Sequence, residues 1–187
     1  MSYCVFESSN MGSTKYDGKI FDAVCSTDAE NGTFGYISGV DTTNGDPVYT
    51  FVKGTAEGKS IFVVDQPAWD EDNHHITNQR RDKFINKAGS VFRIREVNKN
   101  DKFGITIDGV TSASQSAMDT GAYVTIDSTT GKLVAKATAT SGATFEGVVE
   151  GKRTMGGTLV TTAHTYGHSA VMYKIRLVTY TGVGASA

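Results

Sequence analysis

Apolar and polar side chains alternate along several short stretches of the chain. Residues 92–95 read Phe-Arg-Ile-Arg, and over residues 171–179 the apolar residues Val171, Tyr173, Ile175 and Leu177 are separated by polar ones. Successive side chains of a strand point to opposite faces, so this period of two predicts strands with one buried face. Residues 102–108 and 123–127 follow the same pattern.

The first half of the chain contains further strand candidates that are rich in aromatic and β-branched residues, as pleated surfaces favour. They cover residues 19–25, 33–38, 48–53 and 60–65. Turn-forming pairs that tolerate positive φ fall between such runs: Asp17-Gly18, Asn31-Gly32, Asn44-Gly45 and Asp108-Gly109. The pattern predicts a mainly β fold, a Greek-key-like barrel or sandwich of short antiparallel strands.

One hairpin is predicted with particular clarity. Val124-Thr125-Ile126 and Leu133-Val134-Ala135 flank the segment Ser128-Thr129-Thr130-Gly131. A glycine at this position of a hairpin loop supplies the left-handed conformation that such loops need. We therefore expect Gly131 to have a positive φ.

Residues 66–89 interrupt the strand pattern, because they are polar and poor in strand-forming residues. Within them, residues 78–87 predict a short helix, with Thr77 as its N-cap and Gly89 just past its end. The expected organisation has three parts: an extended N-terminal arm over 1–16, an N-terminal β region over 17–89 that includes this excursion, and a C-terminal β-barrel module over 90–187.

Composition narrows the functional classes. The chain has 187 residues with 21 glycines, 2 prolines and a formal net charge of -2, which does not favour a general nucleic-acid binder. Residues 1–90 carry 8 basic and 13 acidic residues, and residues 91–187 carry 10 and 7, so the two halves differ in sign (-5 and +3). Such polarity can orient a protein on a charged partner surface, although ordinary solvated surfaces are the simpler interpretation.

The N-terminal ten residues lack the basic and apolar regions of a signal peptide, and no stretch approaches the length of a membrane span. We therefore expect synthesis in a cytoplasm, no membrane partner, and reduced cysteines. Cys4 and Cys25 are expected to act as small, partly buried apolar residues. A disulfide between them is the alternative, should their two strands pair.

Motifs for catalysis or metal binding are not found in the sequence. Asp70-Glu71-Asp72 with His74-His75 is dense in ligand types, but its spacing matches no zinc or calcium motif, which favours a solvated loop. His164 and His168 lie in a Gly- and Thr-rich segment, where the spacing does not bring the rings together. No nucleophile elbow or complete phosphate loop is present. We expect a non-enzymatic protein with no cofactor and no metal.

Aromatic and basic residues supply candidates for partner contacts. Arg80 and Arg81 follow Trp69 closely in sequence, and aromatic residues beside arginines are frequent anchors at interfaces. Tyr3 and Phe6 lie in the expected arm. These five residues are the candidate contact residues, with a core or loop-anchoring role as the alternative for Trp69 and a solvated face for the arginines.

A family resemblance enters in the second half of the chain. Gly121-Ala122-Tyr123-Val124, Gly131-Lys132-Leu133-Val134-Ala135 and Phe145-Glu146-Gly147-Val148-Val149-Glu150 resemble the small β-barrel modules of tailed-bacteriophage head decoration and other virion structural proteins. Residues 18–26 and 66–70 are similar to proteins of phage and prophage capsid operons of gut Firmicutes.

The resemblance implies a virion protein, made in a bacterial host cytoplasm, that binds the major capsid protein of an assembled shell and stabilises it, often as a homotrimer. A tail or neck structural protein is the first alternative. A carbohydrate-binding β domain, with Trp69 or Tyr166 as the sugar platform, is the second. The arm is expected to add a strand to a neighbour's sheet edge, so that deleting Met1 to Lys15 would abolish particle binding without changing the thermal melt.

Overall fold

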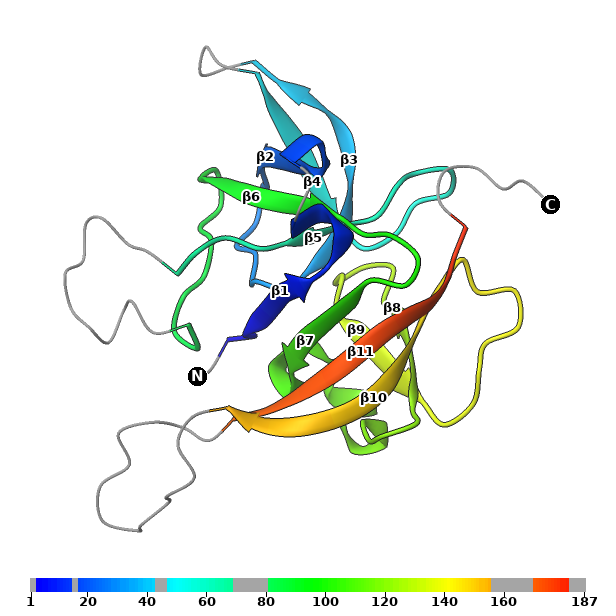
Figure 1. The fold of residues 1–187 in the computed structure, drawn as a ribbon. Helices are drawn as coiled ribbons and strands as arrows, with labels where there is room; N and C mark the ends of the chain where they lie inside the picture. The colour runs from blue at the N-terminus through cyan, green and yellow to red at the C-terminus, as the bar shows by residue number, and fades with distance from the viewer. Residues whose placement is uncertain (1–2, 15–16, 43–46, 69–80, 156–169, 182–187) are drawn as a thin grey trace, which may run out of the picture.

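A computed structural model describes residues 3–14, 17–42, 47–68, 81–155 and 170–181. It confirms the mainly β fold, since strands make up 48% of the structure and helical turns 10%, with antiparallel sheets and a closed barrel. The strands form two units, a five-stranded barrel and a six-stranded sheet. Figure 1 shows the barrel above the sheet, with the β3–β4 and β10–β11 hairpins extending away from each other.

The barrel is built from the first half of the chain and one strand beyond it. Its strands are β2 (Ile20–Val24), β3 (Phe34–Asp41), β4 (Val48–Lys53), β5 (Phe62–Val64) and β6 (Val91–Glu96), in the order β2-β4-β3-β5-β6. The β2–β4 pair is parallel and the others are antiparallel. Alternating residues such as Phe51, Phe92 and Ile94 fill its interior, and the rings of Phe51 and Phe92 meet edge to face at 5.9 Å.

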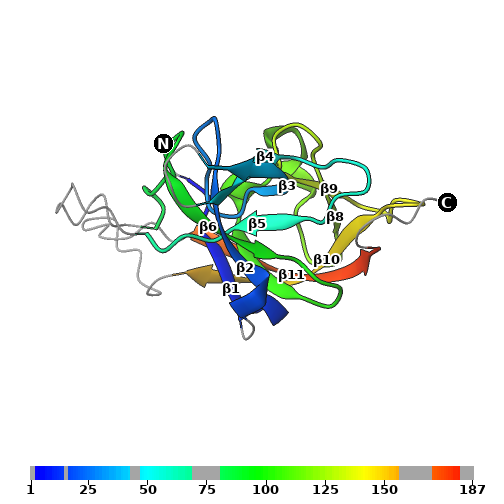
Figure 2. The same ribbon diagram turned by 90° about the horizontal axis from the view of Figure 1, so that it is seen from above.

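The sheet combines the N-terminal strand with the second half of the chain. Its strands are β1 (Phe6–Asn10), β7 (Lys102–Thr106), β8 (Tyr123–Ile126), β9 (Leu133–Lys136), β10 (Phe145–Met155) and β11 (Ala170–Tyr180). The order is β1-β7-β11-β10-β8-β9, and all pairs are antiparallel. Seen from above, the β10–β11 hairpin runs across the width of the molecule (Figure 2).

In the part of the chain that the structure describes, the helical residues form four 3-10 turns: η1 (Gly12–Thr14), η2 (Asp17–Lys19), η3 (Ile107–Gly109) and η4 (Ser112–Ala117). The turns η3 and η4 follow β7 directly, and between them Val110 forms a parallel bridge to Leu133 of β9. This bridge curls the sheet, because it connects the end of β7 to the opposite edge strand.

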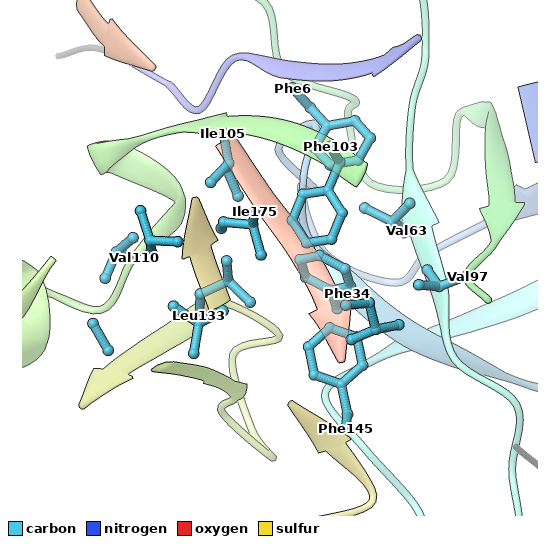
Figure 3. Close-up of a cluster of buried hydrophobic side chains, with 14 of the residues drawn as sticks. Phe6, Phe34, Val63, Val97, Phe103, Ile105, Val110, Leu133, Phe145 and Ile175 are labelled. Atoms are coloured by element: carbon cyan, nitrogen blue, oxygen red, sulfur yellow. The ribbon is translucent and has the colours of Figure 1, made fainter. Parts of the chain in front are cut away.

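One hydrophobic core joins the two units. Phe34 of β3 and Val63 of β5 point out of the barrel and pack among sheet residues, which include Phe103, Phe145 and Ile175. The ring centroid of Phe34 lies 5.6 Å from that of Phe103 and 5.5 Å from that of Phe145. Figure 3 shows these side chains meeting in one cluster. The barrel and the sheet therefore cannot separate without exposing a large aromatic surface.

Two glycines bring the backbones of the units into direct contact. The amide of Phe34 donates to the carbonyl of Gly131, and the amide of Gly54 donates to the carbonyl of Phe34. Gly131 has the expected positive φ of 69°, and a Cβ there would lie 2.1 Å from the Phe34 oxygen. A Cβ on Gly54 would lie 1.9 Å from the oxygen of Ser128. Only glycine fits at both positions.

The N-terminal segment is part of this core, which corrects the expected arm over 1–16. Cys4, Val5, Phe6 and Met11 are buried, and β1 pairs with β7. Three carboxylates also accept hydrogen bonds from the segment: Glu30 from the Cys4 amide (2.9 Å), Asp65 from Ser8 Oγ (2.7 Å) and Asp101 from the Gly12 amide (2.7 Å). Apolar side chains at positions 4–6 explain why the segment is drawn inward rather than left extended.

The expected division of strands at residue 89 also differs from the structure. The closed barrel lies in residues 20–96, because β6 pairs with both β2 and β5, and the second half forms the sheet with β1. The barrel was expected in residues 90–187. Alternation identified the strands, but it does not specify which strands pair.

The helix expected over 78–87 is not found in its described part. Residues 81–83 form a turn, and Asn86 forms an antiparallel bridge with Ala29, exchanging both backbone hydrogen bonds. The Asn86 side chain donates to the Ala29 carbonyl as well. Pairing with the loop before β3 outweighs the local helical preference. Residues 78–80 lie outside the described part of the chain.

The two cysteines lie in separate cores and are free. Cys4 is buried in the core between barrel and sheet, and Cys25 in the barrel interior. Burial, with Glu30 nearby, raises the pKa of the Cys4 thiol to about 12. Both residues therefore serve as small apolar side chains, as the sequence predicted.

The glycine contact can be tested by comparing two glycines that both have positive φ. Alanine at Gly121 (φ 87°) would have no atom within 4 Å of its Cβ, so Gly121→Ala should cost only the backbone strain of about 1–2 kcal/mol. Gly131→Ala should lose about 2 kcal/mol more, because its Cβ overlaps the Phe34 oxygen. Urea unfolding measures both; equal losses would contradict the close contact.

The role of β1 can be tested at Phe6, which is 3% exposed. Phe6→Ala should destabilise the protein by about 3–5 kcal/mol, since it opens a cavity beside Phe103. Ser9→Ala on the same strand is the control, and its exposed side chain should change stability by less than about 0.5 kcal/mol. A Phe6→Ala melting temperature equal to that of the wild type would restore the arm interpretation.

Candidate functional site

The outer face of the sheet carries a groove of about 560 Å³ across β1, β7, β11 and β10. This face points away from the core shared with the barrel, and most of its lining is polar or charged. The lining residues are Glu7, Ser9, Asn10, Asn100, Lys102, Phe103, Gly104, Glu150, Arg153 and Lys174. We call it the sheet groove.

Strand alternation explains why charged side chains gather in the sheet groove. On β11, Tyr173, Ile175 and Leu177 point into the core, so Lys174 and Arg176 point outward. Lys174 pairs with Gly104 on β7 and with Gly151 on β10. Both neighbours in its row therefore lack side chains, and Lys174 stands in the space that they leave.

Two clusters of ion pairs flank Lys174. Glu150 accepts from Lys102 Nζ at 2.9 Å and from Arg176 Nε at 2.5 Å. The hydrogen bonds from Lys102 and Arg176 lower the pKa of the Glu150 carboxyl, so this group is charged at neutral pH. Glu7 pairs with Arg153 and, at 3.8 Å, with Arg81. The glutamates thus hold four of the cations on this face in position.

Lys174 differs from these cations. Its ammonium group has no hydrogen bond or ion pair within the described part of the chain, and its side chain is exposed. The groove lining contains three cations, Lys102, Arg153 and Lys174, against the carboxylates Glu7 and Glu150. The arrangement can bind an anionic group without rearranging its own ion pairs.

A second cavity, of about 420 Å³, lies where the N-terminal segment meets the turns after β7 and the β8–β9 loop. Lys132 Nζ donates to Glu30 Oε1 at 3.1 Å and to the Asp108 carbonyl at 2.8 Å. Partial burial, together with the charge of Glu30, raises the pKa of the Asp108 carboxyl. Tyr3 also lines this cavity.

The candidate contact residues separate in the structure. Phe6 is a core residue, which corrects its expected role in partner contact, because its ring packs 5.6 Å from Phe103. Tyr3 is half-buried in the second cavity. Arg81 is exposed, but its Nη2 donates to the Phe6 carbonyl at 2.6 Å, so it also fastens β1. Trp69 and Arg80 lie outside the described residues, as do the histidine and acidic clusters at 70–75 and 164–168.

The sheet groove could not be predicted from the sequence. The outward orientation of Lys174 and Arg176 was visible in the alternation of β11. The partners Glu7, Lys102 and Glu150 were not, because they come from strands that pair only in the folded protein. Glycines at 104 and 151, beside a lysine on the neighbouring strand, leave no signal in a single sequence.

The described residues contain neither a metal-binding cluster nor a membrane-spanning helix. Over residues 3–14, 17–42, 47–68, 81–155 and 170–181, no group of three or more histidine, cysteine, aspartate or glutamate side chains is placed to hold a metal ion. In the same residues, no helix is long and apolar enough to cross a membrane.

Comparison with known proteins adds no relative: no family model, no curated protein and no solved structure matches the chain.

The raised pKa of Asp108 has a consequence for stability. A carboxyl with a folded-state pKa above its unfolded value binds its proton more tightly when folded, so stability falls as pH rises from the unfolded pKa through the folded one. Asp108→Asn should therefore raise the melting temperature at neutral pH. The gain should vanish in acid, below the unfolded pKa.

Asp127 is the matched control with the opposite sign. Hydrogen bonds from Thr130 lower the pKa of the Asp127 carboxyl, so its charged form stabilises the fold above the unfolded pKa. Asp127→Asn should lower the melting temperature at neutral pH. Calorimetry of both variants across pH checks the pair, and a loss at Asp108→Asn would contradict the assignment.

Proposed function

We propose that the protein is a structural component of a tailed-phage virion, which binds the assembled capsid as a decoration or cement protein and stabilises the shell. Its partner is then the major capsid protein. The proposal draws on the strand and turn pattern of residues 121–150, which resembles head decoration modules. The observation that supports it in the fold is the sheet groove, a charged docking surface on a rigid scaffold.

The scaffold suits such a role. A closed barrel leaves few unpaired strand edges, so it resists unwanted edge-to-edge association at high local concentration. The shared core around Phe34 fixes the sheet against the barrel, and a rigid surface loses little conformational entropy on binding. Self-association as a trimer on the shell belongs to the same proposal.

Two alternative functions make different demands on the surface. A tail or neck protein would use the same scaffold in a different assembly, so the experiment must separate binding to shells from binding to tails. Carbohydrate binding favours an exposed aromatic ring as a platform for the sugar. The aromatic residue that lines the sheet groove is Phe103, and it is 3% exposed. The groove therefore favours a charged partner over a sugar.

The test is co-sedimentation with shells. Shells assembled from the major capsid protein of the parent phage are incubated with the purified protein and separated on a density gradient. The protein should sediment with the shells at a fixed ratio and raise the temperature at which they disrupt. Tail tubes of the same phage are the matched second partner. Binding to tubes but not to shells would replace the decoration proposal with the tail alternative.

A further inference from the structure

We infer that the sheet groove binds a carboxylate-bearing segment of a protein partner, with Lys174 as the cation that pairs with the incoming acidic side chain. That the partner is the capsid shell rests on the proposed function. The geometry around Lys174, the charge of the groove and the polar side chains along its rim support the binding of a carboxylate.

Lys174 is positioned as a binding cation. Gly104 and Gly151 flank it in its row of the sheet, and a Cβ on Gly151 would meet nothing within 4 Å. The ammonium group is therefore accessible from the side of β10. On the side of β7, the Met172 side chain fills the space over Gly104, since its sulfur lies 2.6 Å from where a Cβ would be. Met172 is itself fully buried, so the surface beside Lys174 is well packed.

The glutamates of the groove are paired with other cations, which leaves Lys174 available to a ligand. Glu150 is already engaged by Lys102 and Arg176, and Glu7 by Arg153 and Arg81. Each carboxylate is matched by two cations, so neither draws on Lys174. Arg153 Nη2 also lies 3.8 Å from the sulfur of Met172, which fixes its guanidinium over the sheet. Cations held in place in this way lose little side-chain entropy when a ligand binds.

Side chains at the rim can complete the recognition of a carboxylate. Asn10 and Asn100 line the groove, and their side-chain amide groups make no hydrogen bond with other residues of the described chain. Asn100 has a φ of 70°, and its backbone N–H donates to the Leu177 carbonyl, which fixes the turn that carries it. Two side-chain amide donors in the same groove as an ammonium group suit a carboxylate, which accepts hydrogen bonds at both oxygens.

The mixed charge of the groove favours a protein over a nucleic acid. A phosphate backbone presents a regular row of negative charges and is bound by surfaces with a clear excess of lysine and arginine. Glu7 and Glu150 lie inside this groove, where they would repel neighbouring phosphates. A protein segment with one acidic residue between neutral or basic ones fits the alternation of signs.

Two variants and a control test the inference. Lys174→Glu reverses the binding cation, and Gly151→Glu places a carboxylate beside Lys174 in open space, where it can pair with Lys174 and occupy the site. Lys59→Glu is the control, because Lys59 is an exposed lysine on the barrel turn before β5, so the net charge changes as it does in Lys174→Glu. Thermal melts of all three should match the wild type, which shows that the fold is kept.

Binding is measured with three probes: capsid shells, a fluorescent peptide that carries one glutamate between neutral and basic residues, and a short DNA oligonucleotide. Lys174→Glu and Gly151→Glu should each weaken binding to shells and peptide by about tenfold or more, with Lys59→Glu within about twofold of the wild type. Raising the salt concentration should weaken the wild-type interaction with the peptide.

The outcomes separate this inference from the proposed function. If the wild type binds shells and Lys174→Glu binds equally well, the groove inference is wrong and the decoration proposal stands. If the wild type binds the peptide but not the shells, and Lys174→Glu no longer binds the peptide, the decoration proposal fails and the groove chemistry stands. Tighter binding of the oligonucleotide than of the peptide would overturn the protein partner in favour of a nucleic acid.

Discussion

The fold depends on the contact between Phe34 and the β8–β9 loop. The side chain of Phe34 enters the sheet core between Phe103 and Phe145, while its amide and carbonyl bond to Gly131 and Gly54. One residue of the barrel thus provides an apolar side chain and a backbone hydrogen bond to the sheet unit, while its carbonyl bonds within the barrel to Gly54. Burial of a phenylalanine contributes about 3 kcal/mol, and the hydrogen bond to Gly131 joins the two backbones at this point.

The contact between the barrel and the inner face of the sheet determines which side chains the outer face presents to solvent. Because the inner face is committed to the barrel, β1, β7, β11 and β10 present their opposite side chains to solvent, and these are mainly charged. The buried faces of Phe103 and Ile175 hold the strands in register, so the ion pairs of Glu7 and Glu150 form at fixed positions. The rigidity of the sheet groove follows from the core behind it rather than from the charges themselves, since exposed ion pairs contribute little to stability.

The sequence predicted the strands better than their arrangement. The expected ranges 48–53 and 171–179 match β4 and β11 closely, because alternation and β-branched content act locally. β1 was missed, because the apolar run Cys4-Val5-Phe6 is too short to show a period. Pairing of β6 with β2, and of β1 with β7, joins residues far apart in the chain, and no local pattern encodes that choice. The sheet groove was missed for the same reason.

The two glycines in the Lys174 row show how a site can be built from omitted side chains. At Gly104 a Cβ would lie 2.6 Å from the Met172 sulfur, whereas a Cβ at Gly151 would meet nothing within 4 Å. Glycine in a strand interior costs about 0.5–1 kcal/mol relative to alanine, and Gly151 stands at the irregularity in the β10–β11 register after Val149, where glycine is common. The open space beside it lies next to Lys174, which has no counter-ion among the described residues. In the proposed docking role, a ligand group in this space would pair with the ammonium of Lys174, and the two ion-pair clusters beside it would stay intact.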